Sequence, residues 1–400
     1  MPTYAQQRYT KSDYFIWFVT FLFFVTSNIS DASGPIMFAT TLLVLVASNF
    51  KLVFYKFHVF TLLFCLYSYA TTFWALNGRF TISVSNSIFQ TLVCLFVFYS
   101  YWKDIRNIRI LLKIFMYGGF VVIIYTYYFY GVTSVFDAQS EHRLDNAFSN
   151  VNTISMLAAL IVMIDYYFYL FVKKSWWNIL LVIPCIIIIS ATQSRKGLVV
   201  LVMSVFILYY YKQMRSRKKD DALPYIKIFS FILIGVVALL ILAQTRYFSG
   251  LSHRMDGLIA SVTGEGQMDA SSYMRMLYRN AGWEQFKETP FLGVGMNNSI
   301  IVNSRATGHA TYLHSNYIEL LCNGGIFALI LFYAPLLYIL FNELKYVKKD
   351  STAVLIATWI MIRLVTDWGA VSYVSKMSYF YLMIFFIHLD NLKRKYPEIK

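Results

Sequence analysis

Charged residues are scarce in this sequence. They make up 14% of its 400 residues, against about 25% in soluble globular domains, while 58% of the residues are hydrophobic. Apolar runs long enough for an α-helix to cross a bilayer recur along the chain. A soluble globular protein is therefore excluded. The sequence predicts an all-α, polytopic transmembrane bundle that forms a single integral membrane domain over residues 1–400.

Cysteine is equally scarce, and several common catalytic signatures are missing. Cys65, Cys94, Cys185 and Cys322 all lie inside apolar runs and form neither a CxxC motif nor a Cys/His pair, so we interpret them as core residues. The chain has no HExxH, Walker or GxSxG motif, and no DxD in an external loop. We therefore expect neither a metal site nor a cofactor.

Basic residues exceed acidic ones, but they are not spread evenly. A formal net charge of +15 is compatible with nucleic-acid binding. Most lysines and arginines, however, fall in alternate segments between the apolar runs and at both termini, which is the positive-inside pattern. We therefore expect both termini in the cytoplasm, an even number of spans and no nucleic-acid partner. The first apolar run has no small-residue cleavage pattern, so we expect no cleaved signal.

The apolar runs predict about twelve spans and one large external loop. This loop covers residues 246–311, between spans nine and ten, and contains amphipathic helices, of which the clearest covers 271–288 and ends before Pro290. The expected spans are 14–30, 35–50, 57–76, 82–101, 108–130, 151–172, 177–192, 197–212, 225–245, 312–341, 352–367 and 377–390.

Arginines outside the cytoplasmic segments need a separate explanation. Arg195 lies in a very short external turn, where its guanidinium group can bind a phosphate or extend toward lipid headgroups. Arg275 and Arg279 are four residues apart on the helix expected at 271–288, so their guanidinium groups share one face. Such a pair can bracket a diphosphate, and a solvated helix face that binds anionic lipid explains it equally well.

One histidine opens the apolar run that follows the large loop. His314, with Asn316 close behind it, is placed to act as a general base, although a lone interfacial histidine is more often structural. Glu319 lies inside the run, where an unpaired carboxylate is costly, so we expect it to pair with an arginine or to orient His314. Arg363 and Asp367 are four apart and are expected to pair with each other as a structural feature.

Four segments, in this order, resemble the superfamily of O-antigen ligases and O-antigen or capsule polymerases. They are RLDNAFSNVNTISMLA (143–158), TQSRKGLVVL (192–201), YMRMLYRNAGWEQFKETPFLGVGMNN (273–298) and HSNYIELLCNGGIFALILF (314–332). The resemblance covers about half the chain, with a core at residues 143–341, and the N-terminal spans match in topology alone. The sequence departs from the family pattern by lacking a proline between Asn146 and Asn152 and by having Ser315, not asparagine, after His314.

The resemblance implies a membrane glycosyltransferase. Members of the superfamily act on the outer face of the cytoplasmic membrane and use a polyprenyl-diphosphate-linked glycan as donor. The resemblance implies that His314 is the base or positions the acceptor, while Arg195 and Arg275, assisted by Arg279, bind the diphosphate. It also implies a supporting or glycan-binding role for Arg143, Asn146, Asn316 and Glu319. The implied partners are the lipid-linked donor, a glycan acceptor, the bilayer, a flippase and a chain-length regulator.

Other functions remain open at this point. The many Phe, Tyr, Ile and Lys residues indicate an AT-rich genome, and many such bacteria lack a lipopolysaccharide core. This favours a polymerase of repeat units over a ligase that moves a finished glycan to a lipid, a wall polymer or a protein. A polysaccharide flippase or secondary transporter also fits twelve spans, but many transporters have two similar halves with the longest loop inside. The external arginines near His314 argue against a scaffold without catalysis.

Overall fold

The computed structural model describes residues 9–29, 33–103, 108–137, 144, 150–174, 178–215, 217, 222–245 and 270–399. These residues form α-helices and one short 3₁₀ helix, without a strand among them, which confirms the all-α prediction. The helices are α1 (Lys11–Ile29), α2 (Ser33–Ala47), α3 (Lys56–Ala70), η1 (Thr71–Phe73), α4 (Gly78–Trp102), α5 (Ile108–Tyr130), α6 (Val132–Asp137), α7 (Val151–Phe171), α8 (Ile179–Ala191), α9 (Arg195–Arg215), α10 (Leu223–Ala243), α12 (Ala270–Glu288), α13 (Ser299–Thr307), α14 (Asn316–Tyr346), α15 (Ser351–Thr366) and α16 (Lys376–Lys395).

Each predicted span falls on one of these helices, with ends that differ by a few residues. Six helices are long and apolar enough to cross a membrane, namely α1, α4, α5, α7, α9 and α14. Shorter apolar helices accompany them at Gly34–Ala47, Leu180–Ala191, Leu223–Ala238 and Ser351–Thr366. The chain is therefore a multi-pass membrane protein, and the number of twelve crossings stays a prediction.

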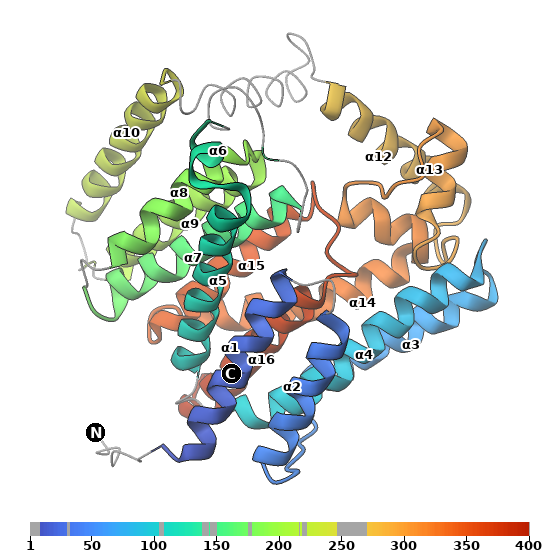
Figure 1. Cartoon of the computed structure of the whole chain (residues 1–400), viewed down its shortest axis with the longest axis horizontal. Coiled ribbons are helices and arrows are strands. Elements are labelled where there is room, and N and C mark those ends of the chain that lie inside the picture. Colours follow the sequence, from blue (N-terminus) through green and yellow to red (C-terminus); the bar gives the residue numbers. More distant parts are fainter. Residues whose placement is uncertain are drawn as a thin grey trace.

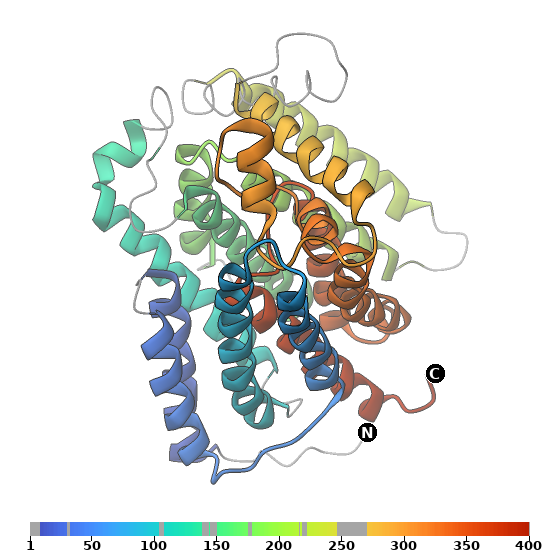
Figure 2. The same cartoon turned by 90° about the vertical axis from the view of Figure 1, so that its right-hand side faces the viewer.

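Helix α7 lies beside α5, α8 and α9 (Figure 1). It packs against α5, α8, α9 and α15, and most of its side chains are buried. Helix α14 packs against α3, α15 and α16, and α16 also packs against α4. Helices α12 and α13 cover one end of the bundle, opposite the end at which α1 begins (Figures 1 and 2).

A break in α14 receives the loop that follows α12. The backbone is non-helical at Gly324 and Gly325, so this helix consists of two parts. Three backbone hydrogen bonds, of 2.8 to 3.0 Å, join residues 290–296 to residues 322–326. The loop therefore satisfies backbone groups that the interrupted helix leaves without their usual partners.

Glycine is required on both sides of this contact. Gly325 has a φ of 62°, and a Cβ there would lie 2.1 Å from the carbonyl oxygen of Phe291. Gly293 has a φ of 64°, and its Cβ would lie 2.5 Å from the carbonyl carbon of Asn323. The contact thus fixes the C-terminal end of α12 against the outer part of α14.

Replacing Gly325 with alanine tests this contact. The Gly325→Ala variant should lower the melting temperature of the detergent-solubilised protein, because a strained backbone of this kind costs about 1–3 kcal/mol. Gly34→Ala is the matched control, since the space around its Cβ position is open. If both variants melt at the same temperature as the unaltered protein, the role given to the glycines is wrong.

Candidate functional site

The turn that begins α9 is held between α7 and α12. Arg195 is 8% exposed, and its guanidinium group donates to the hydroxyl oxygens of Ser272 at 2.9 Å and Ser271 at 3.4 Å. Gly197 allows α9 to approach α7 closely, because a Cβ at Gly197 would lie 1.9 Å from Oγ of Ser155. Arg195 is therefore hydrogen-bonded to the first turn of α12, the helix that carries Arg275 and Arg279.

A cavity of about 420 Å³ brings the three predicted arginines together. Arg195, Arg275 and Arg279 all line it, and Lys196 is a fourth cation in its wall. Among the described residues that line this cavity, none carries a carboxylate. We call this space the cationic cavity. Four cations in one cavity wall attract anions, and guanidinium groups match the geometry of phosphate oxygens.

Burial and a neighbouring cation both act on Arg279. Burial, and then repulsion by Arg275, lower the pKa of the Arg279 guanidinium. This guanidinium lies 5.9 Å from the centroid of the Trp368 ring, where a cation–π contact stabilises it. An anion that enters the cavity would relieve the repulsion between the two arginines.

His314 lies in the segment between α13 and α14 with a left-handed backbone, at a φ of 58°. Its ring centroid is 4.1 Å from that of Tyr312 and 5.8 Å from that of Tyr278, which is nearly parallel to it. Positive φ is uncommon for residues other than glycine. The residues around His314 therefore hold its backbone in this conformation. The imidazole is thus fixed between aromatic neighbours beside the cationic cavity.

Burial and the nearby cations keep the imidazole of His314 neutral. Burial, and then the charges of Arg275, Lys196 and Arg279, lower the pKa of His314 to about 3. Protonation of the ring would add a positive charge beside these cations, which is unfavourable. One ring nitrogen therefore keeps its free electron pair at physiological pH. A neutral imidazole is the form that a general base requires.

Glu319 fixes the segment that carries His314. The carboxylate is 1% exposed, and it accepts hydrogen bonds from the backbone N–H of Leu313 at 2.7 Å, the hydroxyl of Ser299 at 2.5 Å and the amide of Asn323 at 3.4 Å. None of its hydrogen bonds in the described part of the chain involves an arginine. The expected arginine partner is therefore not found, and the bond to Leu313 agrees with the alternative role of orienting His314.

Asn316 is fully buried at the start of α14. Its Oδ1 accepts the backbone N–H groups of Ser372 at 2.8 Å and Tyr373 at 3.0 Å, and its Nδ2 donates to the Tyr333 hydroxyl at 2.9 Å. Both ends of the amide are occupied within the protein. This side chain therefore joins the His314 segment to the turn between α15 and α16.

The predicted pairing of Arg363 with Asp367 is confirmed. Nε of Arg363 lies 3.9 Å from Oδ2 of Asp367, and both side chains are buried. The same carboxylate oxygen accepts the hydroxyl of Tyr333 at 2.8 Å. This pair therefore belongs to the hydrogen-bond network that supports the start of α14.

A second cavity, of about 330 Å³, adjoins the cationic cavity at Lys196, which lines both. Asn150, Asn152, Asn297 and Tyr312 contribute neutral polar groups to its wall. Amide and hydroxyl groups of this kind bind sugar hydroxyls, and we call this space the amide cavity. Neither Lys196 nor Asn297 was assigned to a site from the sequence, although Lys196 lies in the same basic turn as Arg195.

Two predicted supporting residues, Arg143 and Asn146, lie outside the described residues, as does the part of the large loop at 246–269. Within the described ranges, no group of three His, Cys, Asp or Glu residues is placed to hold a metal ion. The four cysteines are buried and free.

The cationic cavity should bind inorganic pyrophosphate. We expect Arg275→Gln and Arg279→Gln each to weaken this binding by about tenfold or more, because a hydrogen bond to a charged group contributes about 1.5–3 kcal/mol. Isothermal titration calorimetry on the purified protein measures the affinity. The matched control is Lys287→Gln on the same helix, since Lys287 is exposed, pairs with Glu284 and lies outside the cavity wall. An equal loss in all three variants would contradict a specific anion site.

Residues 179–333 match the family model described as O-antigen ligase. The matched segment runs from α8 into α14 and contains Arg195, Arg275, Arg279 and His314. The predicted resemblance is therefore confirmed over this part of the chain. No match was found among curated proteins.

Proposed function

Because the chain carries an O-antigen ligase domain at residues 179–333, we propose that it is a membrane glycosyltransferase of surface polysaccharide biosynthesis. It joins oligosaccharide units that are linked to polyprenyl diphosphate, on the outer face of the cytoplasmic membrane. The observation that carries this proposal is the convergence of Arg195, Arg275 and Arg279 on one cavity beside a neutral His314.

The distribution of basic residues supports an outward-facing site. Helix α9 begins with Arg195 at the cationic cavity, and its last turn carries Lys212 and Arg215. Under the positive-inside rule the last turn faces the cytoplasm and the cavity faces the outer side. Twelve crossings with both termini in the cytoplasm complete the proposed topology.

The cationic cavity receives the diphosphate of the donor. When the bond between the anomeric carbon and the diphosphate breaks, negative charge develops on the leaving oxygen. Fixed guanidinium groups in a partly dry site stabilise this charge without having to reorganise, which lowers the barrier. Arg195 is pre-oriented by its two serine partners, and Arg275 and Arg279 approach from the facing helix.

His314 removes the proton of the acceptor hydroxyl. The acceptor sugar lies in the amide cavity, whose wall includes Tyr312, the ring neighbour of His314. Its hydroxyl oxygen attacks the anomeric carbon while the bond to the diphosphate breaks, the proton passes to the imidazole, and polyprenyl diphosphate leaves. Direct attack of this kind inverts the anomeric centre.

The donor itself prepares this base. Burial, and then Arg275, Lys196 and Arg279, hold the pKa of His314 at about 3, which makes the imidazole a weak base. A bound diphosphate would carry negative charge next to these cations and oppose their effect on the ring, so the pKa of His314 would rise. Proton removal is therefore favoured when the donor is present.

Two observations bear on the choice between a polymerase and a ligase, and they favour different functions. Composition favours a polymerase, which joins repeat units to each other. The description of the matching family model favours a ligase, which moves a finished glycan to another acceptor. Both reactions use the same donor chemistry, so the product distinguishes them.

A gel of surface polysaccharide tests the proposal in a strain that lacks this protein. The strain is complemented with the unaltered chain or with His314→Ala, Arg195→Ala, Arg275→Ala or the control Lys287→Ala, at equal protein levels. We expect the first three variants to lose the long ladder and to accumulate single repeats, because a general base alone contributes about 10²–10⁴-fold in rate. The control should restore the ladder.

Any other outcome changes the proposed function or the proposed site residues. Long chains that persist on their carrier lipid identify a ligase. Repeat units that never reach the outer face favour the flippase alternative. Full ladders with all three variants would show that the proposed site residues are wrong.

A further inference from the structure

A cavity of about 180 Å³ lies between α1, α7, α15 and the segment that leads into α16. Arg363 and Asp367 of α15 line it, together with Thr153 of α7 and Ser375 at the start of α16. We call this space the Arg363 pocket. It is smaller than the roughly 300–1,000 Å³ of pockets that hold drug-sized ligands. A ligand of this pocket is therefore about the size of a single ring.

Two charged groups in its wall retain hydrogen-bonding capacity. Arg363 is 8% exposed, and its Nε has no hydrogen-bond partner among the described residues, although Oδ2 of Asp367 lies 3.9 Å away. The Asp367 carboxylate accepts the hydroxyls of Tyr333 and Ser372 with that same Oδ2. A buried N–H group that finds no acceptor is unfavourable. Nε of Arg363 can therefore donate to a ligand, and Oδ1 of Asp367 can accept from one.

Farther from the helix ends, the wall of the Arg363 pocket is apolar. Along α7 it runs from Thr153 in the first turn to Leu160, which is about 10 Å at 1.5 Å per residue. Trp359 of α15 and Tyr381 of α16 belong to the same wall, and their ring centroids are 4.9 Å apart. The pocket thus combines hydrogen-bonding groups near the ends of the helices with aliphatic and aromatic surface one or two turns inside them.

These two kinds of surface together match an uncharged sugar ring. Each sugar hydroxyl can donate and accept, as Arg363 and Asp367 require, and the C–H groups of the ring pack against aliphatic and aromatic side chains. A wholly apolar ligand would leave both charged groups buried beside hydrocarbon. A ligand with a carboxylate or phosphate would place its negative charge beside Asp367.

The Arg363 pocket adjoins the amide cavity. The two spaces share Thr153 and Met156 of α7, and Ala370 and Val371 of the segment after α15. A sugar chain that enters the amide cavity can therefore continue into the Arg363 pocket.

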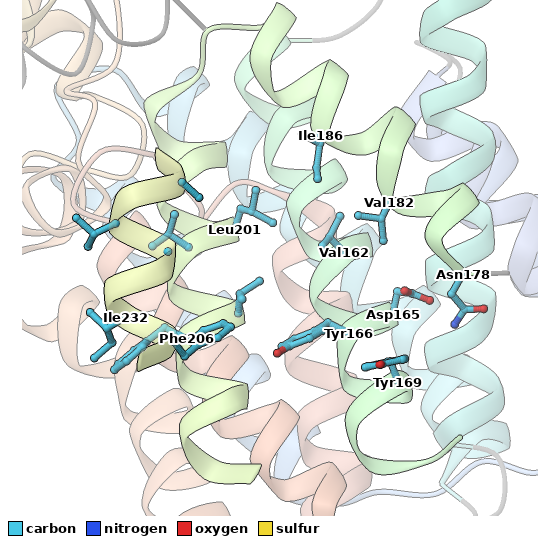
Figure 3. Close-up of a pocket in the computed structure, with 16 residues that line it drawn as sticks. Val162, Asp165, Tyr166, Tyr169, Asn178, Val182, Ile186, Leu201, Phe206 and Ile232 are labelled. Atoms are coloured by element: carbon cyan, nitrogen blue, oxygen red, sulfur yellow. The ribbon is translucent and has the colours of Figure 1, made fainter. Parts of the chain in front are cut away.

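A larger pocket, of about 670 Å³, does not offer this continuity. It lies between α7, α8, α9 and α10, and Val162, Leu201 and Ile232 are among the hydrocarbon side chains of its wall (Figure 3). Asp165 and Asn178 lie beside each other at one edge (Figure 3). None of its described lining residues also lines the amide cavity.

We propose that the Arg363 pocket is a specificity subsite for one uncharged sugar residue of the acceptor glycan, an inference that rests on the proposed function. The acceptor sugar that reacts lies in the amide cavity beside His314, and the sugar joined to it lies in the Arg363 pocket. There, Nε of Arg363 donates to one sugar oxygen, and Oδ1 of Asp367 accepts a sugar hydroxyl. This second sugar takes no part in the reaction, so the pocket acts on acceptor binding and therefore on KM.

Ser375→Phe tests the assignment, because it fills the pocket from a residue outside the walls of the amide and cationic cavities. The donor is the lipid-linked repeat unit isolated from a strain that lacks this protein. The two acceptors are the methyl glycosides of the monosaccharide and of the disaccharide at the non-reducing end of that unit. We expect the unaltered protein to have a KM about tenfold lower for the disaccharide, because hydrogen bonds to charged groups add to its binding.

Ser375→Phe should remove this difference by raising KM for the disaccharide, while kcat and KM for the monosaccharide stay unchanged. Ser375→Leu, which fills less of the pocket, should give an intermediate KM. The control is Ser134→Phe, because Ser134 is exposed and lies outside the wall of the pocket. This variant should keep the full difference between the two acceptors.

Three results would overturn the inference. If the unaltered protein has the same KM for both acceptors, the second sugar is not bound. If the two Ser375 variants slow transfer to both acceptors equally, or to neither, the pocket is not a separate subsite. If the unaltered protein transfers glycan to neither acceptor, the proposed function fails and this inference fails with it. Transfer to the monosaccharide without an advantage for the disaccharide overturns the inference alone, so the two failures are distinguishable.

Discussion

The backbone contact between residues 290–296 and the break in α14 is the interaction on which the site depends. It joins the end of the helix that carries Arg275 and Arg279 to the helix that follows His314. A small apolar cluster packs the same elements together, consisting of Tyr278, Val294, Val302, Leu313, Ile318 and Cys322. Because a continuous helix would leave no opening for the loop, the interruption at Gly325 places the C-terminal end of α12. Arg275 and Arg279 are thereby positioned relative to the segment that carries His314.

The electrostatics of the site follow from this placement. The contact fixes α12, and Arg195 is bound to its first turn, so four cations surround a cavity without a carboxylate in its described wall. Burial and the neighbouring cations lower the pKa of Arg279 and that of His314. Under the proposed function, a bound diphosphate would oppose the effect of these cations. Donor binding and preparation of the base would then be two consequences of the same charge distribution.

Local patterns in the sequence were sufficient for the long helices and for two of the arginines, but not for the short helices α6 and α13. Apolar runs predicted where the long helices lie, and the i, i+4 spacing of Arg275 and Arg279 predicted their common face on α12. Contacts between distant segments were not predictable, because the bond from Arg195 to Ser272 spans 77 positions and depends on tertiary packing. The carboxylate of Glu319 was expected beside a cation or near the histidine, and its bond to a backbone N–H group carries no sequence signal. Lys196 was not predicted as a site residue, because one basic turn gives no indication that two cavities meet there.

A structure of the protein with a bound polyprenyl diphosphate, determined by electron cryomicroscopy in lipid nanodiscs, tests the central claim most directly. The account predicts both phosphates in the cationic cavity, within hydrogen-bond distance of Arg195, Arg275 and Arg279, with His314 on the side from which the acceptor hydroxyl approaches, opposite the departing oxygen. Phosphates bound elsewhere, with the guanidinium groups of this cavity left without an anion, would contradict it.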